Sequence, residues 1–357
     1  MSVVFAIIFA VILFSLLIFV HELGHFLAAK LSGVQVNEFS MFMGPALVKW
    51  QRGETLYSIR TIPIGGYCAM EGEDADTDNP RSFQKASWWK RLIILVAGSF
   101  MNFVTGVLIV AIVLSFQTSF ATTRVETIEP WSVVSENDGL RQGDVILELN
   151  GEKMVLFEDF SLATMLLPDG KYDMVVLRDG EKLTLKDVSM IRQEVDDGNG
   201  GKVKLYGLSF GREEATPSGV VKRVMPTAFN YVKSVIVSLR MLFSGQAGIK
   251  DMTGPVGIVQ IMSESAAEAE TTANAVLNML YFGGFLAINL AVMNMLPIPA
   301  LDGGRVLALL VITAIEGITR KKIDPKYEGY IHTVGMILLL IFMAVVMFKD
   351  IFVIFKG

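Results

Sequence analysis

The stretch HELGH places two histidines, His21 and His25, around the glutamate Glu22. On a helix, residues four apart share a face, so the two imidazoles would point the same way, one turn apart. Such a pair can bind one metal ion, and Glu22 could act as general base on a metal-bound water. The same histidines could instead hydrogen-bond to the main chain or line a helix interface.

The HELGH stretch lies at the end of an apolar run, Val3–Val20. An ionisable side chain inside a membrane helix is costly unless it has a buried partner, so such residues are functional candidates by default. The chain has 3 histidines in all, and two of them are here. We therefore expect a metal site at this position rather than a purely structural cluster.

Composition indicates a membrane protein with a water-exposed part. Of the 357 residues, 52% are hydrophobic, which is high for a soluble protein. The net charge of −5 gives no nucleic-acid signature. The single cysteine, Cys68, excludes an internal disulfide and a cysteine-rich metal site. The first apolar segment lacks a basic start, so we do not expect a cleavable signal peptide.

Four apolar segments each reach the ~20 residues that a helix needs to cross a bilayer. We predict a polytopic α-helical membrane protein with four transmembrane helices, a cytoplasmic-side membrane β-loop and an extracytoplasmic β-rich domain. Residues 306–318 are also apolar, and they could continue the third span or lie beside it. In chain order the expected parts are transmembrane helix 1 with HExxH (1–31), the β-loop region (32–91), transmembrane helix 2 (92–120), the extracytoplasmic domain (121–212), an amphipathic helix and linker (213–275), transmembrane helix 3 with LDGG (276–304), a cytoplasmic connection (305–329) and transmembrane helix 4 (330–357).

Lysine and arginine near the ends of the spans predict the orientation, because cytoplasmic connections are enriched in them. Residues 32–91 and 305–329 should both be cytoplasmic. The two termini and the 121–212 domain then lie outside the cytoplasm. The basic residues that support this orientation are Lys49, Arg52, Arg60, Arg81, Lys85 and Lys90, followed by Arg305, Arg320, Lys321, Lys322 and Lys326.

The β-loop region alternates polar and apolar residues over Tyr57–Ile62, which predicts short strands. Pro63 and Gly65-Gly66 interrupt the alternation. An exposed strand here could pair with an extended peptide by strand addition. The alternation alone favours a plain cytoplasmic hairpin.

The 121–212 insert should be a compact β-rich domain. Asn150-Gly151 and Asp179-Gly180 are hairpin turn signals. Residues 139–151 resemble the middle of a PDZ domain, with its familiar GL..GD.I..ING pattern, and Phe157–Leu166 would be the PDZ helix beside the peptide groove. Residues 194–202, rich in Asp and Gly, should form a loop. The expected strands are Thr123–Glu129, Val145–Asn150, Tyr172–Arg178 and Lys182–Val188.

A catalytic zinc usually has three protein ligands, and Asp302 is the favoured third ligand. It follows Pro297 and Pro299, which break the third span at its cytoplasmic end, the side on which HELGH should also lie. Taken alone, Asp302 is about as well explained by a helix N-cap or a turn before Gly303-Gly304. His332 is the weaker candidate because no polar motif surrounds it, and we place it at the external end of the last span, on the wrong side.

Together these motifs resemble the site-2 protease family of intramembrane zinc metalloproteases, in the bacterial type with one PDZ-like domain. The resemblance is carried by HELGH in the first helix, the PDZ-like insert, and N.LPIP.LDGGR at residues 294–305. IP.GGY at Ile62–Tyr67 and GP.GI at Gly254–Ile258 add to it. The chain has room for one PDZ-like domain only, in which it differs from the best-known members.

The resemblance implies a role for each matching residue. His21, His25 and Asp302 would bind Zn²⁺, and Glu22 would be the general base. Asn294 would steady the substrate or the oxyanion. Residues 62–67 would be a membrane-dipping β-loop that presents the substrate as an added strand.

The resemblance also implies an activity. The expected enzyme is a multi-pass protein of the bacterial plasma membrane, surrounded by lipid. It would cleave single-span membrane proteins, such as anti-sigma factors or signal-peptide remnants, in regulated intramembrane proteolysis, after an upstream site-1 protease has acted on them.

Two other classes of protein could use some of these features. A metal transporter or sensor would need polar groups along the spans, where Asn102 and His332 look isolated. A membrane-anchored PDZ scaffold would leave Glu22 and Asp302 unexplained.

Overall fold

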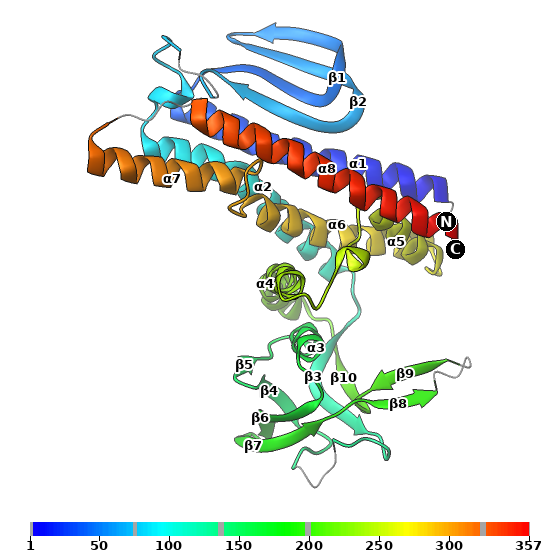
Figure 1. The fold of residues 1–357 in the computed structure, drawn as a ribbon. Coiled ribbons are helices and arrows are strands. Elements are labelled where there is room, and N and C mark those ends of the chain that lie inside the picture. The colour runs from blue at the N-terminus through cyan, green and yellow to red at the C-terminus, as the bar shows by residue number, and fades with distance from the viewer. Residues whose placement is uncertain (1–2, 74–76, 135–138, 197–200, 322–325, 357) are drawn as a thin grey trace. The chain divides into compact units, whose positions relative to one another are not determined.

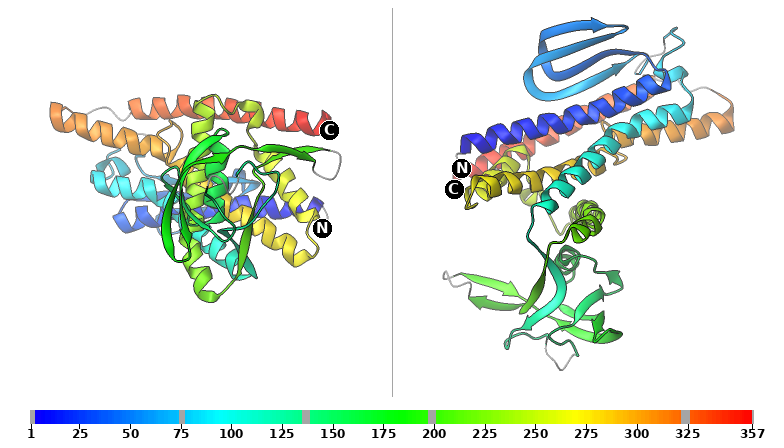
Figure 2. Two further views of the ribbon diagram at one scale, coloured as in Figure 1. Left: turned by 90° about the horizontal axis from the view of Figure 1, so that it is seen from below. Right: turned by 180° about the vertical axis from the view of Figure 1, so that it is seen from behind.

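The computed structural model describes residues 3–73, 77–134, 139–196, 201–321 and 326–356. The chain divides into two compact units, shown as ribbons in Figures 1 and 2. Unit 1 contains residues 1–110 and 238–357, and unit 2 contains residues 111–237. Lys322, one of the basic residues that support the predicted orientation, lies outside the described residues. So do residues 197–200, which belong to the loop expected at residues 194–202.

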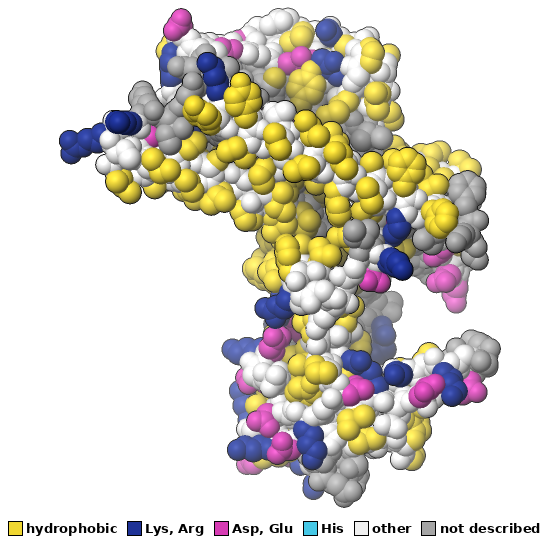
Figure 3. Space-filling view, viewed as in Figure 1, with side chains coloured by type: hydrophobic (Ala, Val, Ile, Leu, Met, Phe, Trp, Pro, Cys, Tyr) yellow, Lys and Arg dark blue, Asp and Glu magenta, His cyan; other side chains and the backbone are white. Residues whose placement is uncertain are grey.

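Unit 1 is built mainly from long helices. Among the residues that the structure describes, four of these helices are long and apolar enough to cross a membrane, which confirms the predicted class of a polytopic helical protein with β-rich parts. Apolar side chains cover much of the helical surface that Figure 3 shows. The helices of unit 1 are α1 (Val3–Ser32), α2 (Trp88–Ser115, whose last turn belongs to unit 2), α5 (Pro255–Ala267), α6 (Thr272–Asn294), α7 (Asp302–Thr319) and α8 (Lys326–Lys356), with short 3-10 turns at Phe83–Lys85 and Ile249–Asp251.

The helix ends differ from the expected ones at two places. Instead of continuing to residue 304, the third long helix ends at Asn294, and Asp302 begins a separate helix that occupies much of the expected 305–329 connection. Pro297 and Pro299 explain the break, because proline lacks an N–H and clashes with the preceding turn. The second helix ends at Ser115, and strand β3 has already begun at Phe120.

Two small cores hold the helices of unit 1 together. α1 packs on α5 and α6 through Ala10, Leu17 and Met279, which are fully buried. Toward its other end, α1 contributes Ala29 to a core with Ile94 of α2. The HELGH stretch lies between these two cores, so its side chains are held on both sides.

The strands β1 (Val36–Arg52) and β2 (Thr55–Met70) form a folded antiparallel sheet (Figure 1). Residues 36–41 of β1 pair with residues 56–59 of β2 on one side and with residues 66–70 on the other. Residues 46–52 of β1 pair with the outer side of residues 55–60. The predicted strands are thus confirmed. Residues 66–70 form one edge of this sheet, and no other described strand pairs with that edge.

Unit 2 is a β-rich domain with the hydrogen-bonded strand order β10-β3-β4-β6-β7, and β5 pairs with β4. Its core includes Val125, Ile146, Met174 and Val188, which are inaccessible or nearly so. The elements are β3 (Ser119–Ile128), β4 (Val145–Leu149), β5 (Glu152–Lys153), α3 (Phe157–Leu166), β6 (Gly170–Arg178), β7 (Glu181–Met190), β8 (Gln193–Asp196), β9 (Lys202–Leu205), β10 (Leu208–Glu214) and α4 (Pro217–Phe243), whose last turn belongs to unit 1.

Local turn chemistry explains much of unit 2. Asn150-Gly151 and Asp179-Gly180 both have positive φ at their two residues and join β4 to β5 and β6 to β7, as predicted. The predicted helix Phe157–Leu166 is confirmed. The loop expected at residues 194–202 is wrong in part, because β8 and β9 pair as a two-stranded sheet. The PDZ-like assignment of this unit stays a prediction.

Asp159 connects α3 to α4. It is 7% exposed, and its Oδ1 accepts hydrogen bonds from Asn230 (3.1 Å) and Lys233 (2.9 Å) of α4. Its Oδ2 accepts the main-chain N–H groups of Val155 and Leu156. Burial raises the pKa of Asp159, but these hydrogen bonds outweigh burial and hold the pKa below its ordinary value. The carboxylate therefore fixes α4 against α3.

Candidate metal centre

Three side chains from two helices converge in unit 1. His21 and His25 lie on α1, one turn apart and facing the same way, and Asp302 begins α7. The Nε2 atoms of the two histidines are 3.1 Å apart. Asp302 Oδ2 lies 3.1 Å from His21 Nε2 and 3.4 Å from His25 Nε2. The structure thus brings together the three residues predicted as metal ligands, which form a candidate metal site.

The donor set fits zinc. Bonds of about 2.0–2.1 Å at tetrahedral angles require donor atoms roughly 3.3 Å apart, close to the three distances observed here. Asp302 Oδ2 is buried and, despite its short contacts with His21 and His25, accepts no well-directed hydrogen bond from the described residues. A metal ion between the three atoms would satisfy all of them. Three protein ligands leave a fourth position open, as catalytic zinc sites require.

The loop between α6 and α7 brings Asp302 to the histidines. Ala300 has a φ of +88°, a backbone conformation that non-glycine residues seldom adopt and that is often found near functional sites. At Gly303 a Cβ atom would lie 2.3 Å from the main chain of Met295, so only glycine fits there. The cap of α7 is Leu301, which makes no side-chain capping bond. Asp302 is therefore not the helix cap that its sequence also allowed.

Helix α2 forms another wall of the centre. The main-chain oxygen of Ile94 accepts a 2.8 Å hydrogen bond from Nδ1 of His25, which leaves Nε2 of that ring free for a metal. A Cβ atom at Gly98 would lie only 2.4 Å from His25 Nε2. Asn102, which looked isolated in the sequence, is 1% exposed and contacts His21. Gly98 and Asn102 were not assigned to the site from the sequence. A glycine and an amide one turn apart in an apolar helix could have indicated that this face of α2 packs against a polar site.

Glu22 lies next to the ligands and beside the β1–β2 sheet. A Cβ atom at Gly66 would be 3.5 Å from Glu22 Cγ and 3.0 Å from the main-chain oxygen of Ser40. The absence of a side chain at Gly66 therefore lets the sheet edge pass close to the carboxylate. Ser15 of α1 donates a hydrogen bond to the main-chain oxygen of Pro63 and ties the same strand to the helix.

Comparison with known proteins agrees with this arrangement. The model of peptidase family M50 matches residues 9–342. The chain belongs to peptidase family M50. A candidate zinc metalloprotease of Clostridium perfringens is 37% identical to it over 347 residues, which cover 97% of this chain and 98% of the relative. Regulator of sigma-W protease RasP of Bacillus subtilis is 27% identical (96% and 97% covered), and zinc metalloprotease RasP of Shouchella clausii is 28% identical (95% and 97% covered).

In this M50 peptidase, His332 lies at the same end of α8 as the ligand loop, which corrects its expected place. Its Nδ1 accepts a 3.2 Å hydrogen bond from the main-chain N–H of Ala300, two residues before Asp302. The expectation that His332 is isolated and on the opposite side from Asp302 was wrong, because the first turns of α8 lie against the loop that precedes α7. At Gly335, one turn further along α8, a Cβ atom would lie 2.4 Å from Pro299. α8 therefore supports the ligand loop from behind.

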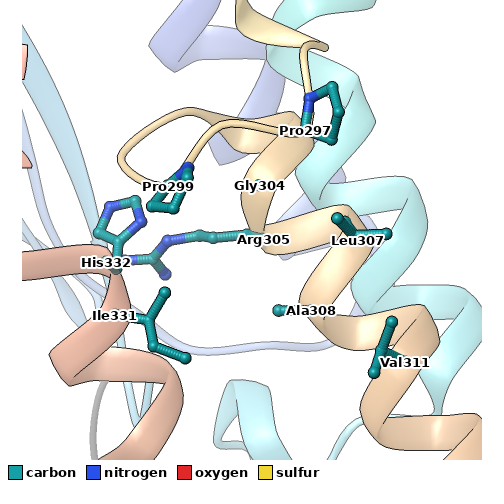
Figure 4. A pocket seen from close by; sticks show the side chains of 9 residues that line it. All are labelled: Pro297, Pro299, Gly304, Arg305, Leu307, Ala308, Val311, Ile331 and His332. Carbon is teal, nitrogen blue, oxygen red and sulfur yellow. The ribbon is translucent and has the colours of Figure 1, made fainter. Parts of the chain in front are cut away.

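A small apolar pocket of about 230 Å³ lies between α7 and α8, next to this loop (Figure 4). Arg305 extends across it toward His332, and Pro299 forms part of its wall. The Arg305 guanidinium donates a 2.6 Å hydrogen bond to Glu73, in the chain that follows β2. One ion pair thus links the start of α7, close to Asp302, to the β1–β2 region.

Asn294, the predicted substrate-binding amide, is the last residue of α6 and is half-buried. Its side chain hydrogen-bonds none of the described residues, so its amide is available to a ligand. Its role stays a prediction.

Proposed function

We propose that this chain cleaves transmembrane segments of single-span membrane proteins within the bilayer. The chain is a zinc metalloprotease of peptidase family M50 and a multi-pass membrane protein. The observation that carries the proposal is that two of the three candidate zinc ligands, and the candidate base Glu22, lie on α1, a helix apolar enough to span a membrane. A peptidase centre at that depth can reach peptide bonds that are otherwise buried in lipid.

The chemistry follows from the side chains around the ligands. Bound zinc would polarise the scissile carbonyl and make water acidic enough to lose a proton near neutral pH. His21, His25 and Asp302 would hold the ion. Glu22 would take a proton from the attacking water and pass it to the leaving amine. Asn294 would donate a hydrogen bond to the developing oxyanion, a contact whose loss typically costs ~10²–10³ in rate.

The sheet edge offers a way to hold the substrate. An intact helix uses its carbonyl groups in intrahelical hydrogen bonds, so a transmembrane substrate must be extended before it is cleaved. The edge at residues 66–70 pairs with no other described strand and begins at Gly66, beside Glu22. A substrate added to this edge as a strand would place successive peptide groups near the base.

The substrate class and orientation extend the proposal. The name of one relative, Regulator of sigma-W protease, associates that protein with a sigma factor, which is consistent with anti-sigma factors as substrates of this chain. Signal-peptide remnants are also single spans and would fit the same site. The basic residues support an orientation in the bacterial plasma membrane with residues 32–91 in the cytoplasm and with both termini and unit 2 outside the cytoplasm. Unit 2, as a PDZ-like domain, would admit substrates that a site-1 protease has already trimmed.

The test is the Glu22→Gln variant in membranes with a single-span reporter. Glutamine keeps the size of the side chain but cannot accept the proton, so the variant should retain zinc and lose cleavage. Zinc content is measured by metal analysis and cleavage by the appearance of the shortened reporter. Cleavage by E22Q at the wild-type rate would overturn the assignment of the base.

A further inference from the structure

The Asn102 amide on α2 faces the imidazole of His21 on the side away from the metal centre. Its Nδ2 is 3.4 Å from His21 Nδ1. The amide is almost completely buried, and its Oδ1 has no hydrogen-bond partner among the described residues. A buried amide oxygen without a partner is costly, so a native structure should have a use for it.

The position of the proton on the His21 imidazole gives the Asn102 Oδ1 atom a role. In the candidate metal centre, Nε2 of His21 must present a lone pair to the metal. A neutral imidazole then carries its proton on Nδ1, which becomes a donor. The Nδ2 atom opposite is also a donor, so two donors would face each other. A half-turn about the Cβ–Cγ bond of Asn102 exchanges Nδ2 and Oδ1, and the orphan oxygen then accepts the Nδ1 proton.

His25 shows the same arrangement with a different partner. Its Nδ1 donates to the main-chain oxygen of Ile94, also on α2, 2.8 Å away. Both ligand rings therefore have their second nitrogen directed at α2, one toward a carbonyl and one toward an amide. Such outer contacts orient a ligand ring and increase its basicity.

We propose that Asn102 is a positioning residue of the metal centre, which accepts the Nδ1 proton of His21 through its amide oxygen and so orients the Nε2 lone pair toward zinc. This inference rests on the proposed zinc site. In this role Asn102 would contact neither the metal nor the substrate.

The test measures zinc affinity rather than cleavage. The full-length protein in detergent is stripped of metal and titrated with zinc against a chromophoric chelator. Asn102→Ala should raise the zinc dissociation constant about 10- to 100-fold, the usual effect of losing such a partner. Asn102→Asp keeps an acceptor oxygen at the same place and should recover most of the affinity. Asn102→Leu keeps the volume but not the acceptor, and should bind as weakly as the alanine variant.

The matched control is Ser99→Ala. Ser99 is also buried on α2, and its Oγ has no hydrogen-bond partner among the described residues. This variant should bind zinc like the wild type. If the wild-type protein binds no zinc, the proposed function fails. If it binds zinc and N102A and N102L bind equally well, or N102D binds as weakly as they do, the positioning role of Asn102 is refuted while the zinc site stands.

Discussion

Gly98 should be required for metal binding because α2 passes so close to the ligand rings. A Cβ atom at this position would lie 2.4 Å from His25 Nε2 and 2.8 Å from His21 Cε1, whereas ordinary contacts begin at 3.4 Å. Gly98→Ala therefore requires a shift of about 1 Å in a ring or in the helix, well beyond what metal–ligand bonds tolerate. In the metal-free protein His25 can turn away only by giving up its hydrogen bond to Ile94, so the metal-free form loses some stability and most of the strain falls on the metal-bound state.

The size of the effect follows from the cost of overpacking. An extra methyl group in a well-packed interior costs about 1–3 kcal/mol. At 1.4 kcal/mol for each factor of ten, this strain should weaken zinc binding roughly 5- to 150-fold. Zinc affinity is measured by chelator competition on the purified protein, and the stability of the metal-free form is measured by thermal unfolding.

Gly106→Ala is the matched control on the same helix. Its Cβ atom would lie 2.5 Å from Ile288 Cγ1, a comparable clash at a place without ligands. Both variants should lower the thermal stability, but G98A alone should lose zinc affinity. If G98A binds zinc as tightly as the wild type, the close approach of α2 does not constrain the ligand rings and Gly98 is not required at the metal centre.

Two further predictions concern buried carboxylates outside the metal centre. Asp159→Asn should destabilise unit 2 by about 1–3 kcal/mol, because an amide cannot accept from all the donors around it. Since the pKa of Asp159 is held below its ordinary value of 3.8, its contribution is present above that pH and is lost as the pH falls through the lower folded value. Hydrogen exchange of α3 and α4 should thus lose part of its acid dependence in D159N, and an unchanged acid profile would contradict this. Asp350 accepts the N–H of Gly257 (3.0 Å) in the first turn of α5, so Asp350→Ala should lower stability by about 0.5–2 kcal/mol in thermal unfolding, and Asp350→Asn should lose less. Equal losses in D350A and D350N would exclude this capping role.

Local signals predicted much of the structure, and the failures have a common physical cause. HELGH specified two ligands because the helical period alone puts them on one face. The Asn-Gly and Asp-Gly turns specified two hairpins because both residues must adopt positive φ. The contact between Asn102 and His21 joins residues 81 positions apart, and no local pattern encodes it. Pro297 and Pro299 predicted a break at the end of the third span, but the sequence left open whether residues 306–318 continue that span or lie beside it, because apolar residues stand on both sides of the break.

The HELGH motif is connected to the observed metal centre by a close approach of the main chains of α1 and α2. A Cβ atom at Gly24, within HELGH itself, would lie 2.4 Å from the main-chain oxygen of Ala97. Gly98 follows directly on α2 and makes room for the ligand rings. Small residues let membrane helices pack at short distance, since lipid provides no hydrophobic force to drive them together. The glycine between the two histidines therefore belongs to the metal centre as much as the ligands do: it brings Ile94 and Asn102 of α2 within reach of the ring nitrogens that zinc leaves free. HELGH can thus be understood as both a ligand motif and a helix-packing motif, and a larger residue at position 24 should disturb the zinc site without touching a ligand.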